Sequence, residues 1–432
     1  MHANSSQGQQ ASSVQSLPGP DDITRIQLEN GITILSRANF NSPSVTISGI
    51  LEVGSLFDPD ERLGLADFTA TALMRGTGRR SFQQIYETLE ACGASMGFNS
   101  RTHTTHFYGR ALAEDLDLVL ELLAECVRQP AFPAEQVERL RAQLLTGLAI
   151  RAQDSGEMAS LAFDEIVYAG HPYRRPNDGY PHTVQAIRQE DLAGFHGSFY
   201  GPGGMLVAVV GGVDPALAVE KVTTALGDWR NPQQPKPTEL PPVSHLESRQ
   251  QKKVALPGKS QTDIVIGAAG PGRRSPDFLA ASLGNNVLGQ FGMMGRLGES
   301  IREQAGLAYY ASSSLSVGVG PGPWSISMGV NPANVERAIA LALKEVERFT
   351  QEPVSDEELA DSKANYIGQL PLSLESNGGV AAALLNLERY DLGLDYYQRY
   401  NDLIQAVTKE QALEAAQRYL DPERLGIAIA GP

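Results

Sequence analysis

Hydrophobic and polar positions follow one order of patterns twice along the chain. In each half a run of alternating apolar residues, at 43–53 and at 261–269, predicts a strand. Each run is followed by a segment of helical periodicity, at 63–75 and at 275–289. Further helices and strands are predicted after these, among them a helix with an apolar stripe of Leu116, Leu120 and Leu123. The two halves therefore share one coarse layout.

Three segments of the two halves can be aligned directly. QAIRQEDLAGFHGSFYGPGGMLVAVVGG from Gln185 matches QAVTKEQALEAAQRYLDPERLGIAIAGP from Gln405 at an offset of 220 residues. PAEQVERLRAQLLTGL matches SDEELADSKANYIGQL at an offset of 222, and TISGILEVG from Thr46 matches TDIVIGAAG from Thr262 at an offset of 216. Three matches in one order, at nearly one offset, predict a tandem duplication of a unit of a little over 200 residues.

This duplication divides the chain into four segments. Residues 1–21, which begin with a stretch rich in Ser, Gln and Gly, predict a disordered leader, and 22–230 and 252–432 predict the two homologous units. The stretch 231–251 contains five prolines and few large apolar residues, which predicts a semi-extended linker. Clustered strands with helices packed on one face, rather than strict βαβ alternation, predict an α+β fold with an antiparallel-rich sheet in each unit.

The charge balance excludes one class of partner. The chain has 432 residues, with 35 Lys and Arg against 50 Asp and Glu, so its formal net charge is −15. Nucleic-acid binding through a diffuse positive field is therefore not expected. The two cysteines, Cys92 and Cys126, are too few for a disulfide framework or a thiolate metal cluster.

Targeting and membrane segments are not predicted either. No window approaches about 18 uninterrupted apolar residues, so no membrane span is expected. The first residues lack a basic region followed by an apolar segment, so no secretory signal is expected. These features together predict a cytoplasmic protein.

The segment GLADFTATALMRGT, 64–77, carries the strongest family signal. It resembles a helix of the pitrilysin/insulinase family of zinc peptidases, which includes mitochondrial processing peptidase, with the pattern G-x-A-H-F-L-E-H-x-x-F-K-G-T. Further segments in family order are LEACGASMGFNSRT (89–102), AGHPYRRP (169–176) and FYGPGGMLVAVVGGV (199–213). The resemblance covers about residues 22–432 and implies a chain that forms half of a clamshell chamber. The residues of the first segment that match are Gly64, Ala66, Phe68, Gly76 and Thr77, with Arg75 in place of Lys.

The same comparison identifies residues that this chain lacks. The family's H-x-x-E-H motif places two imidazoles on one helix face to bind Zn²⁺, with a glutamate between them as general base. The corresponding residues here are Asp67, Ala70 and Thr71. A third family ligand, a glutamate on a later helix, corresponds to Gly147. The resemblance thus implies no metal and no cofactor in this chain.

The second unit contains RLGESIREQAGLAYYASSS, 296–314, which resembles the family's R-x-x-x-x-x-x-Y segment. In the family this Arg and Tyr lie opposite the zinc and engage the backbone carbonyl of the substrate. The matching residues are Arg302 and Tyr309. A guanidinium and a phenol can both donate hydrogen bonds to a carbonyl oxygen that gains charge during water attack. The residues alone also allow Arg302 to cap or salt-bridge its own helix, and Tyr309 to begin a half-buried strand.

This combination resembles the second chain of two-chain bacterial family members. It implies a non-catalytic but activity-required subunit of a heterodimeric zinc endopeptidase. The partner would be a homologous subunit that carries the zinc on an intact H-x-x-E-H motif, and the substrates would be unfolded peptides. Two alternatives remain: a metal-free assembly protein with no part in proteolysis, and an independent hydrolase with a rebuilt site.

Other candidate residues are interpreted as structural. His103 and His106 resemble a ligand pair, but residues i and i+3 of a strand point to opposite faces, and the neighbouring Thr, Phe and Tyr favour a strand. His171 lies in a family-like turn. GASMG, 93–97, fits G-x-S-x-G, but it follows a helix-like segment rather than a strand, so a nucleophile elbow is not expected.

Overall fold

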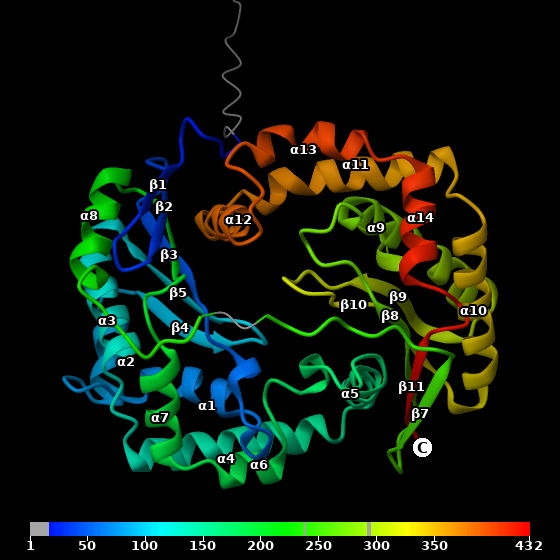
Figure 1. The fold of residues 1–432 in the computed structure, drawn as a ribbon, viewed down its shortest axis with the longest axis horizontal. Helices are drawn as coiled ribbons and strands as arrows, with labels where there is room; N and C mark the ends of the chain where they lie inside the picture. Colours follow the sequence, from blue (N-terminus) through cyan, green and yellow to red (C-terminus); the bar gives the residue numbers. More distant parts are fainter. Residues whose placement is uncertain (1–16, 237–238, 292–294) are drawn as a thin grey trace, which may run out of the picture.

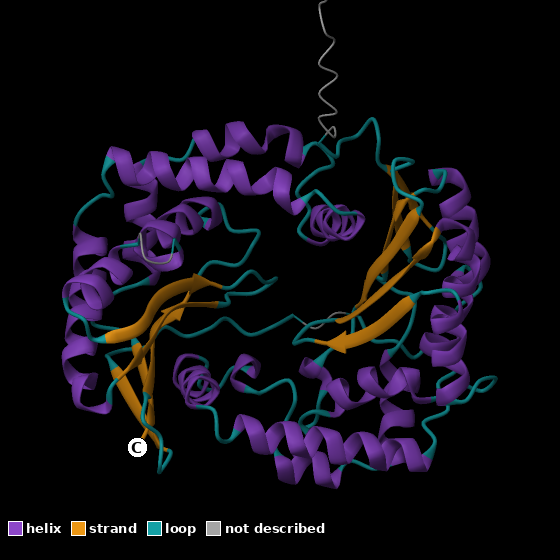
Figure 2. Cartoon of the chain, turned by 180° about the vertical axis from the view of Figure 1, so that it is seen from behind, coloured by secondary structure: helices purple, strands orange, loops and turns teal. Residues whose placement is uncertain are grey.

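The computed structural model describes residues 17–236, 239–291 and 295–432. Figure 1 shows two sheets that flank the middle of the molecule, with helices along the outside. In the view from behind, the strands are confined to two separate regions and the helices form most of the perimeter (Figure 2). Residues 1–16 of the predicted leader lie outside the described residues, whereas Leu17 packs against the core and Pro18 is buried.

The first sheet has six strands in the order β1-β2-β6-β3-β5-β4. Only β2 and β6 pair in parallel, and the other neighbours are antiparallel. All six residues of the central strand β6 are buried, as expected for a run of small and β-branched residues. The strands are β1 (Thr24–Gln27), β2 (Thr33–Ala38), β3 (Ser44–Leu51), β4 (Ser95–Ser100), β5 (Thr105–Leu112) and β6 (Leu206–Gly211).

The second sheet repeats this topology without a counterpart of β1. Its order is β7-β11-β8-β10-β9, with β7 and β11 parallel and the other pairs antiparallel. The predicted tandem α+β units are therefore confirmed, and each sheet is antiparallel-rich. The strands are β7 (Gln250–Ala255), β8 (Thr262–Ala269), β9 (Ala308–Leu315), β10 (Pro323–Val330) and β11 (Gly426–Gly431).

The sheet register corrects one detail of the repeat. Thr46 pairs with Val210, and Asp263 pairs with Ala430. Val210 and Ala430 occupy the same place in the two central strands, so Thr46 corresponds to Asp263 rather than to Thr262. The alignment of β3 with β8 was therefore wrong by one residue. In a strand, such a slip exchanges the two faces of the sheet.

Helices cover the outer face of each sheet. In the first unit α3 and α8 pack on it, with the apolar stripe of α3 buried as predicted, and in the second α10 takes this place. The helices of the first unit are α1 (Leu65–Ala72), α2 (Phe82–Ala91), α3 (Leu116–Arg128), α4 (Ala134–Arg151), α5 (Ser155–Val167), α6 (Pro181–Ala186), α7 (Gln189–Phe199) and α8 (Pro215–Leu226). Those of the second are α9 (Phe278–Asn285), α10 (Val335–Gln351), α11 (Asp356–Ser373), α12 (Asn377–Arg389), α13 (Tyr396–Gln405) and α14 (Lys409–Tyr419).

The two units exchange one helix each. Helix α5 of the first unit packs on β8 and β11 of the second sheet, through residues such as Phe163 and Ile166. Helix α12 of the second unit packs on β3 and β6 of the first sheet, through Val380 and Leu384. Each sheet thus has its own helices on one face and a helix of the other unit on the opposite face (Figure 1). This exchange joins the units through buried apolar surface.

The connection between the units lacks helix and strand wherever it is described. Residues 231–236 and 239–249 form turns and irregular chain, and β7 begins at Gln250, within the predicted linker. The boundaries proposed at 230 and 252 stay a prediction. Within the described part of the chain, no helix combines the length and the apolar composition that a membrane crossing requires.

Candidate functional site

Helix α1, on which the family carries its zinc motif, begins with a cap made by Asp58. Its carboxylate accepts hydrogen bonds from the backbone N–H groups of Gly64 and Ala66, both at 2.8 Å. Burial raises the pKa of this carboxyl to about 7, although both hydrogen bonds favour the charged form. Asp58 satisfies two of the free N–H groups at this helix end, and no sequence signal singled it out.

The residues that match the family pattern around α1 have packing roles. Gly64 has φ = +94°, and a Cβ there would lie 2.8 Å from the carbonyl oxygen of Asp178. Ala66 and Phe68 are fully buried in the core of the first unit. Gly76, which follows the short helix η3 (Leu73–Arg75), has φ = +140°. These matching residues are therefore explained by the packing and backbone conformation of α1 and its flanking turns.

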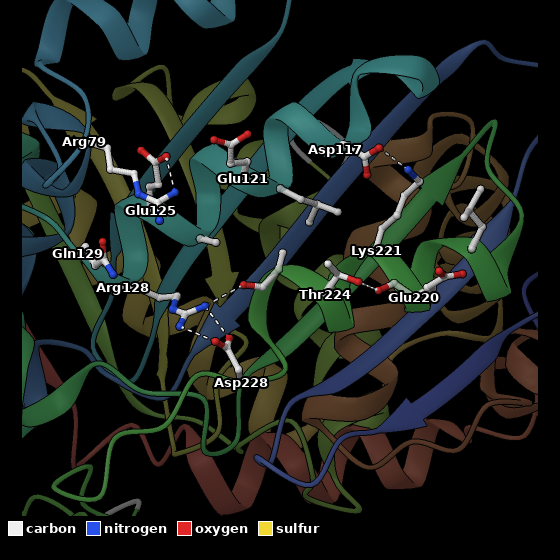
Figure 3. Close-up of a pocket in the computed structure, with 14 residues that line it drawn as sticks. Arg79, Asp117, Glu121, Glu125, Arg128, Gln129, Glu220, Lys221, Thr224 and Asp228 are labelled. Carbon is white, nitrogen blue, oxygen red and sulfur yellow. Dashed lines mark hydrogen bonds and ion pairs between the residues drawn. The ribbon is translucent and has the colours of Figure 1, made fainter.

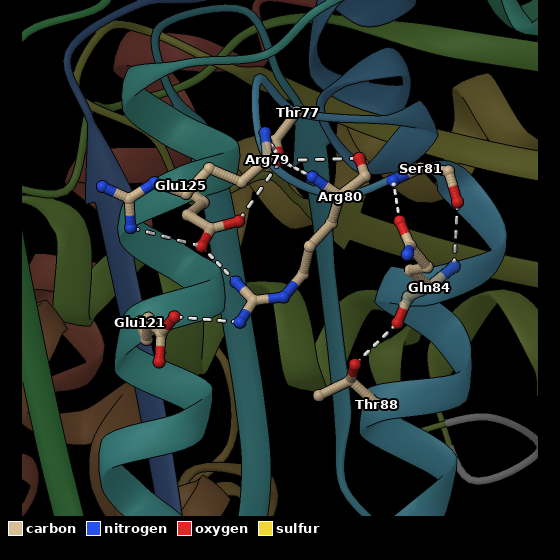
Figure 4. A network of polar contacts seen from close by, with 8 residues as sticks. All are labelled: Thr77, Arg79, Arg80, Ser81, Gln84, Thr88, Glu121 and Glu125. Atoms are coloured by element: carbon tan, nitrogen blue, oxygen red, sulfur yellow. Dashed lines mark hydrogen bonds and ion pairs between the residues drawn. The ribbon is translucent and has the colours of Figure 1, made fainter.

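Thr77 belongs to a polar network that ties the turn after α1 to α3 (Figure 4). Its hydroxyl donates to the buried carboxylate of Glu125 at 3.2 Å and accepts from the backbone N–H of Arg80 at 2.9 Å. The Arg80 side chain also pairs with Glu125, and it reaches Glu121 at 2.9 Å. The buried charge of Glu125 is thereby both paired and hydrogen-bonded, as such groups require.

The four positions predicted from the resemblance to correspond to the family's zinc ligands and general base lie on α1 and α4, which pack together. Ala70 is fully buried and has no side-chain donor. The Thr71 hydroxyl donates to the carbonyl oxygen of Asp67 at 2.9 Å, within its own helix. Gly147 lies in α4, and a Cβ there would meet no atom within 4 Å. Asp67 is the one member of the set with a carboxylate.

Asp67 has an unusual electrostatic environment. Burial, and secondly the negative charge of Asp178, raise its pKa to about 6. The guanidinium of Arg151, on α4, pairs with Asp178 and donates to the carbonyl oxygen of Gly179 at 2.8 Å. Its hydrogen bonds are therefore made to these groups and not to Asp67. Near neutral pH a carboxyl with this pKa is mostly ionised, so Asp67 could supply one oxygen ligand to a metal.

These donors do not fit a zinc ion. A catalytic Zn²⁺ needs about three protein ligands, and the four positions supply one carboxylate and one hydroxyl already bonded to its helix. Across all the described residues, no group of three or more His, Cys, Asp or Glu side chains is arranged to hold a metal.

Arg302 lies in the second unit, in the π-helical segment η8 (Gly298–Gln304), which packs against β9. Its side chain is 43% exposed, and the nearest acidic group, of the adjacent Glu303, is 4.0 Å away. An ion pair of this length at the surface contributes little to stability. The chain then reverses at Gly306, which has φ = +62°, and β9 follows. The Arg302 guanidinium thus has donors available to a ligand.

Tyr309 occupies a β-bulge on an edge strand. The pairing of β10 with β9 places Gly329 opposite Tyr310 and Val330 opposite Ala308, so Tyr309 has no partner residue. Its side chain is 64% exposed, and its hydroxyl forms no hydrogen bond with the described residues. Bulges of this kind often lie beside active sites, where they re-aim a side chain.

The next residue shows the contrast within one strand. Tyr310 donates from its hydroxyl to the carboxylate of Asp263 at 2.7 Å, in the second sheet. Of the two adjacent tyrosines, Tyr310 is therefore tied to the sheet and Tyr309 is available. The half-buried strand position considered from sequence does not describe Tyr309, which is largely exposed. The helix salt bridge considered for Arg302 is present only as the long ion pair with Glu303.

The two sets of predicted residues lie in different halves of the chain. Figure 1 shows α1 and α4 in one half and β9 in the other. The structure brings Asp67, Ala70 and Thr71 together with the helix that carries Gly147, and it places Arg302 and Tyr309 on either side of one turn.

The prediction for His103 and His106 was wrong in its geometry. Strand β5 begins only at Thr105, so His103 lies in the preceding turn, and both imidazoles line one cavity. His103 shares a hydrogen bond of 2.6 Å with the Tyr173 hydroxyl. His171 is structural as expected: it is buried, accepts from the backbone N–H of Tyr173 and bonds the carbonyl oxygen of Pro241.

A separate groove of about 610 Å³ lies between α3 and α8, on the outer face of the first sheet (Figure 3). Its charged side chains are largely paired with one another. Lys221 bonds Asp117 at 2.5 Å, and Arg128 bonds Asp228 at 2.7 Å. None of the predicted site residues lines this groove. It is therefore interpreted as a solvated surface groove.

Comparison with known proteins places these features in a family. The family model described as Insulinase (Peptidase family M16) matches residues 33–175, and the model described as Peptidase M16 inactive domain matches residues 186–366. An uncharacterized zinc protease of Mycobacterium tuberculosis is 26% identical over 416 residues, which cover 94% of this chain and 93% of that protein.

Two further proteins extend the comparison. The crystal structure of a peptidase M16 inactive domain from Pseudomonas fluorescens has a TM-score of 0.87 and 26% identity, and the match covers 95% of this chain and 98% of that one. Human cytochrome b-c1 complex subunit 1 is 24% identical over 269 residues, or 61% of this chain and 55% of that protein. With the matched motifs and the duplicated fold, the chain belongs to the insulinase/pitrilysin (M16) peptidase family and resembles its inactive subunits.

Proposed function

We propose that this chain is the non-catalytic, activity-required subunit of a heterodimeric zinc endopeptidase. A homologous subunit with an intact H-x-x-E-H motif would hold the zinc and cut unfolded peptides. This chain would complete the chamber and place Arg302 and Tyr309 at the scissile carbonyl, opposite that zinc. One observation carries the proposal: the second unit presents two exposed donors, Tyr309 with no hydrogen bond to the described residues and Arg302 with one ion pair of 4.0 Å, whereas the positions of the zinc motif in the first unit lack a ligand set.

The chemistry assigned to Arg302 and Tyr309 follows from their donor groups. When water attacks a peptide carbonyl, negative charge develops on its oxygen, and donors fixed near that oxygen stabilise the transition state. The guanidinium and the phenol can each donate one such hydrogen bond. The bulge at Tyr309 supports this role. It leaves Tyr309 without a partner residue on β10, and bulges can re-aim a side chain.

Reconstitution with the zinc-bearing subunit tests the proposal. We expect peptide cleavage from the mixture at a one-to-one ratio, little cleavage from either chain alone, and zinc in the partner subunit. Stoichiometric zinc in this chain alone, or full activity of the partner without it, would contradict the proposal.

The likeness to a subunit of the cytochrome b-c1 complex favours a second candidate, a metal-free assembly protein. Under this alternative, the chain would bind its partner without any role for Arg302 at the reacting carbonyl. Cleavage by the mixture would then be the same with wild-type chain and with Arg302→Ala. The two candidates therefore predict opposite outcomes in one assay.

A further inference from the structure

A cavity at the centre of the molecule is formed by both units. It has a volume of about 820 Å³ and is lined by the turn before β5, by α5, by the loop between β9 and β10, and by α12. Figure 1 shows the β4–β5 and β9–β10 hairpins reaching the middle of the molecule from opposite sides. We call it the central cavity, and its chemistry-bearing side chains include His103, His106, Asp164, Tyr173, Asn386 and Arg389.

Arg389, the last residue of α12, is the most under-satisfied of these groups. Its Nε is buried and has no hydrogen-bond partner in the described part of the chain, and its Nη1 makes one long contact of 3.4 Å with Nε2 of His106. No carboxylate of the described residues lies within 4.0 Å of the guanidinium, and its Cζ lies over the Tyr390 ring, 5.7 Å from the ring centroid. A buried donor without a partner among the described residues calls for an explanation, and a bound ligand is one that can be tested.

The other groups of the central cavity do not neutralise this charge. Burial, and then the charge of Arg389, lower the pKa of both His103 and His106 to about 4, so their imidazoles are neutral at pH 7. Burial raises the pKa of Asp164 to about 7, which leaves it partly protonated. Outside the residues that line the cavity, burial raises the pKa of Glu52, and the charge of Arg389 lowers it to a smaller extent.

We propose that the central cavity binds a small ligand through an oxyanion group, a carboxylate or a phosphate, with Arg389 as its anchor. A guanidinium binds such groups in a bidentate fork, and Arg389 lines the cavity without an ion pair to any described carboxylate. Its neighbours His106 and Asn386 supply further polar contacts. The volume suits a small molecule or a few residues of peptide, since ligand sites commonly measure about 300–1,000 Å³.

Such a ligand would touch both units at once. It would bridge α12, which packs on the first sheet, and α5, which packs on the second. Because it binds the folded form, it would also raise the melting temperature. This inference does not depend on the partner subunit, so the whole chain can be tested alone.

Calorimetric titration of the full chain tests the inference with four probes: inorganic phosphate, citrate, and one short peptide with either a free or an amidated C-terminus. We expect at least one oxyanion probe to bind with a Kd below about 1 mM, and Arg389→Gln to weaken it about tenfold or more. Phosphate binding would indicate a phosphorylated ligand, whereas a preference for the free over the amidated peptide would indicate a carboxylate.

Two variants keep the test independent of folding. Arg337→Gln, an exposed arginine on α10, is the matched control and should bind like wild type. Asn386→Asp adds negative charge one turn before Arg389 on an exposed position, and it should weaken binding severalfold even if Arg389→Gln does not fold. Failure of every oxyanion probe to bind wild type at about 10 mM, or equal binding by Asn386→Asp and wild type, would overturn the inference.

Discussion

The residues that match the family differ in burial between helix α1 of the first unit and the η8–β9 turn of the second unit. Around α1, the residues that match the family are buried or have left-handed backbone, as Phe68 and Gly64 show. At the η8–β9 turn, the matching residues Arg302 and Tyr309 are exposed, and their side chains make one polar contact with the described residues, the ion pair of 4.0 Å between Arg302 and Glu303. One region thus preserves a scaffold, and the other preserves side chains that are free to bind.

This difference separates packing from chemistry. A residue such as Phe68 is explained by the core it fills, so its match to the family says little about activity. The exposed donors of Arg302 and Tyr309 are expected to stabilise the fold little, because surface polar groups and surface ion pairs contribute little. We propose that a ligand accounts for their presence. The following variants test each side of this comparison, beginning with the largest expected change in stability.

Replacement of Gly64 should damage the scaffold most. Gly64→Ala puts a Cβ 2.8 Å from the Asp178 carbonyl oxygen at φ = +94°, and we expect a loss of about 2–4 kcal/mol in the free energy of unfolding. Urea denaturation measures it. Gly194→Ala on α7 is the control, because its Cβ would meet no atom within 4 Å. Equal stability of the two variants would contradict the packing role.

Loss of one hydrogen bond from the network of Thr77, Arg80 and Glu125 should have the next largest effect on stability. Thr77→Val leaves the buried Glu125 carboxylate short of one donor, and we expect a loss of about 1–3 kcal/mol in the free energy of unfolding. Thr146→Val, at an exposed position of α4, should change it by less than about 0.5 kcal/mol. A Thr77→Val protein as stable as wild type would show that Arg80 alone satisfies Glu125.

Asp67 should make stability depend on pH. Its pKa is about 6 in the folded chain and lower when unfolded, so the native state binds more protons and the free energy of unfolding falls as pH rises from about 4 to 6. In Asp67→Asn, the decrease in the free energy of unfolding over this pH range should be smaller by about 1–2 kcal/mol. Urea denaturation at several pH values measures the slope. Parallel profiles for variant and wild type would indicate that Asp67 is hydrated in solution.

The smallest change is expected at Gly147. Its Cβ would meet open space in the middle of α4, so Gly147→Glu should fold and should be up to about 1 kcal/mol more stable, as expected when glycine leaves a helix interior. The same denaturation assay measures it. A loss above about 1 kcal/mol would show that this surface is covered in solution.

The duplicated fold could be predicted because its signals are local and repeated. Alternating apolar residues marked β3 and β8, and the matched closing segments marked β6 and β11. The exchange of α5 and α12 could not be predicted, because an apolar stripe shows that a helix face is buried and not which sheet covers it. The one-residue slip between β3 and β8 has the same origin, since register is set by pairing across strands.

The candidate site was predictable in its residues and not in its geometry. Motif matching located Arg302 and Tyr309, but the bulge at Tyr309 exists only in the pairing of β9 with β10. The pair of His103 and His106 was misplaced because the start of β5 at Thr105 leaves no clear trace in the sequence. The central cavity joins four distant segments, so a scan along the chain could not assemble it.

The most direct test of the central claim is the turnover of the reconstituted pair with Arg302→Ala. Wild-type chain, Arg302→Ala and the control Arg337→Ala are each mixed with the zinc-bearing subunit, and kcat is measured while size-exclusion chromatography confirms assembly. If Arg302 stabilises the developing oxyanion, Arg302→Ala should lower kcat about hundredfold with assembly intact, and Arg337→Ala should leave it unchanged. Equal kcat for Arg302→Ala and Arg337→Ala in assembled pairs would contradict the account.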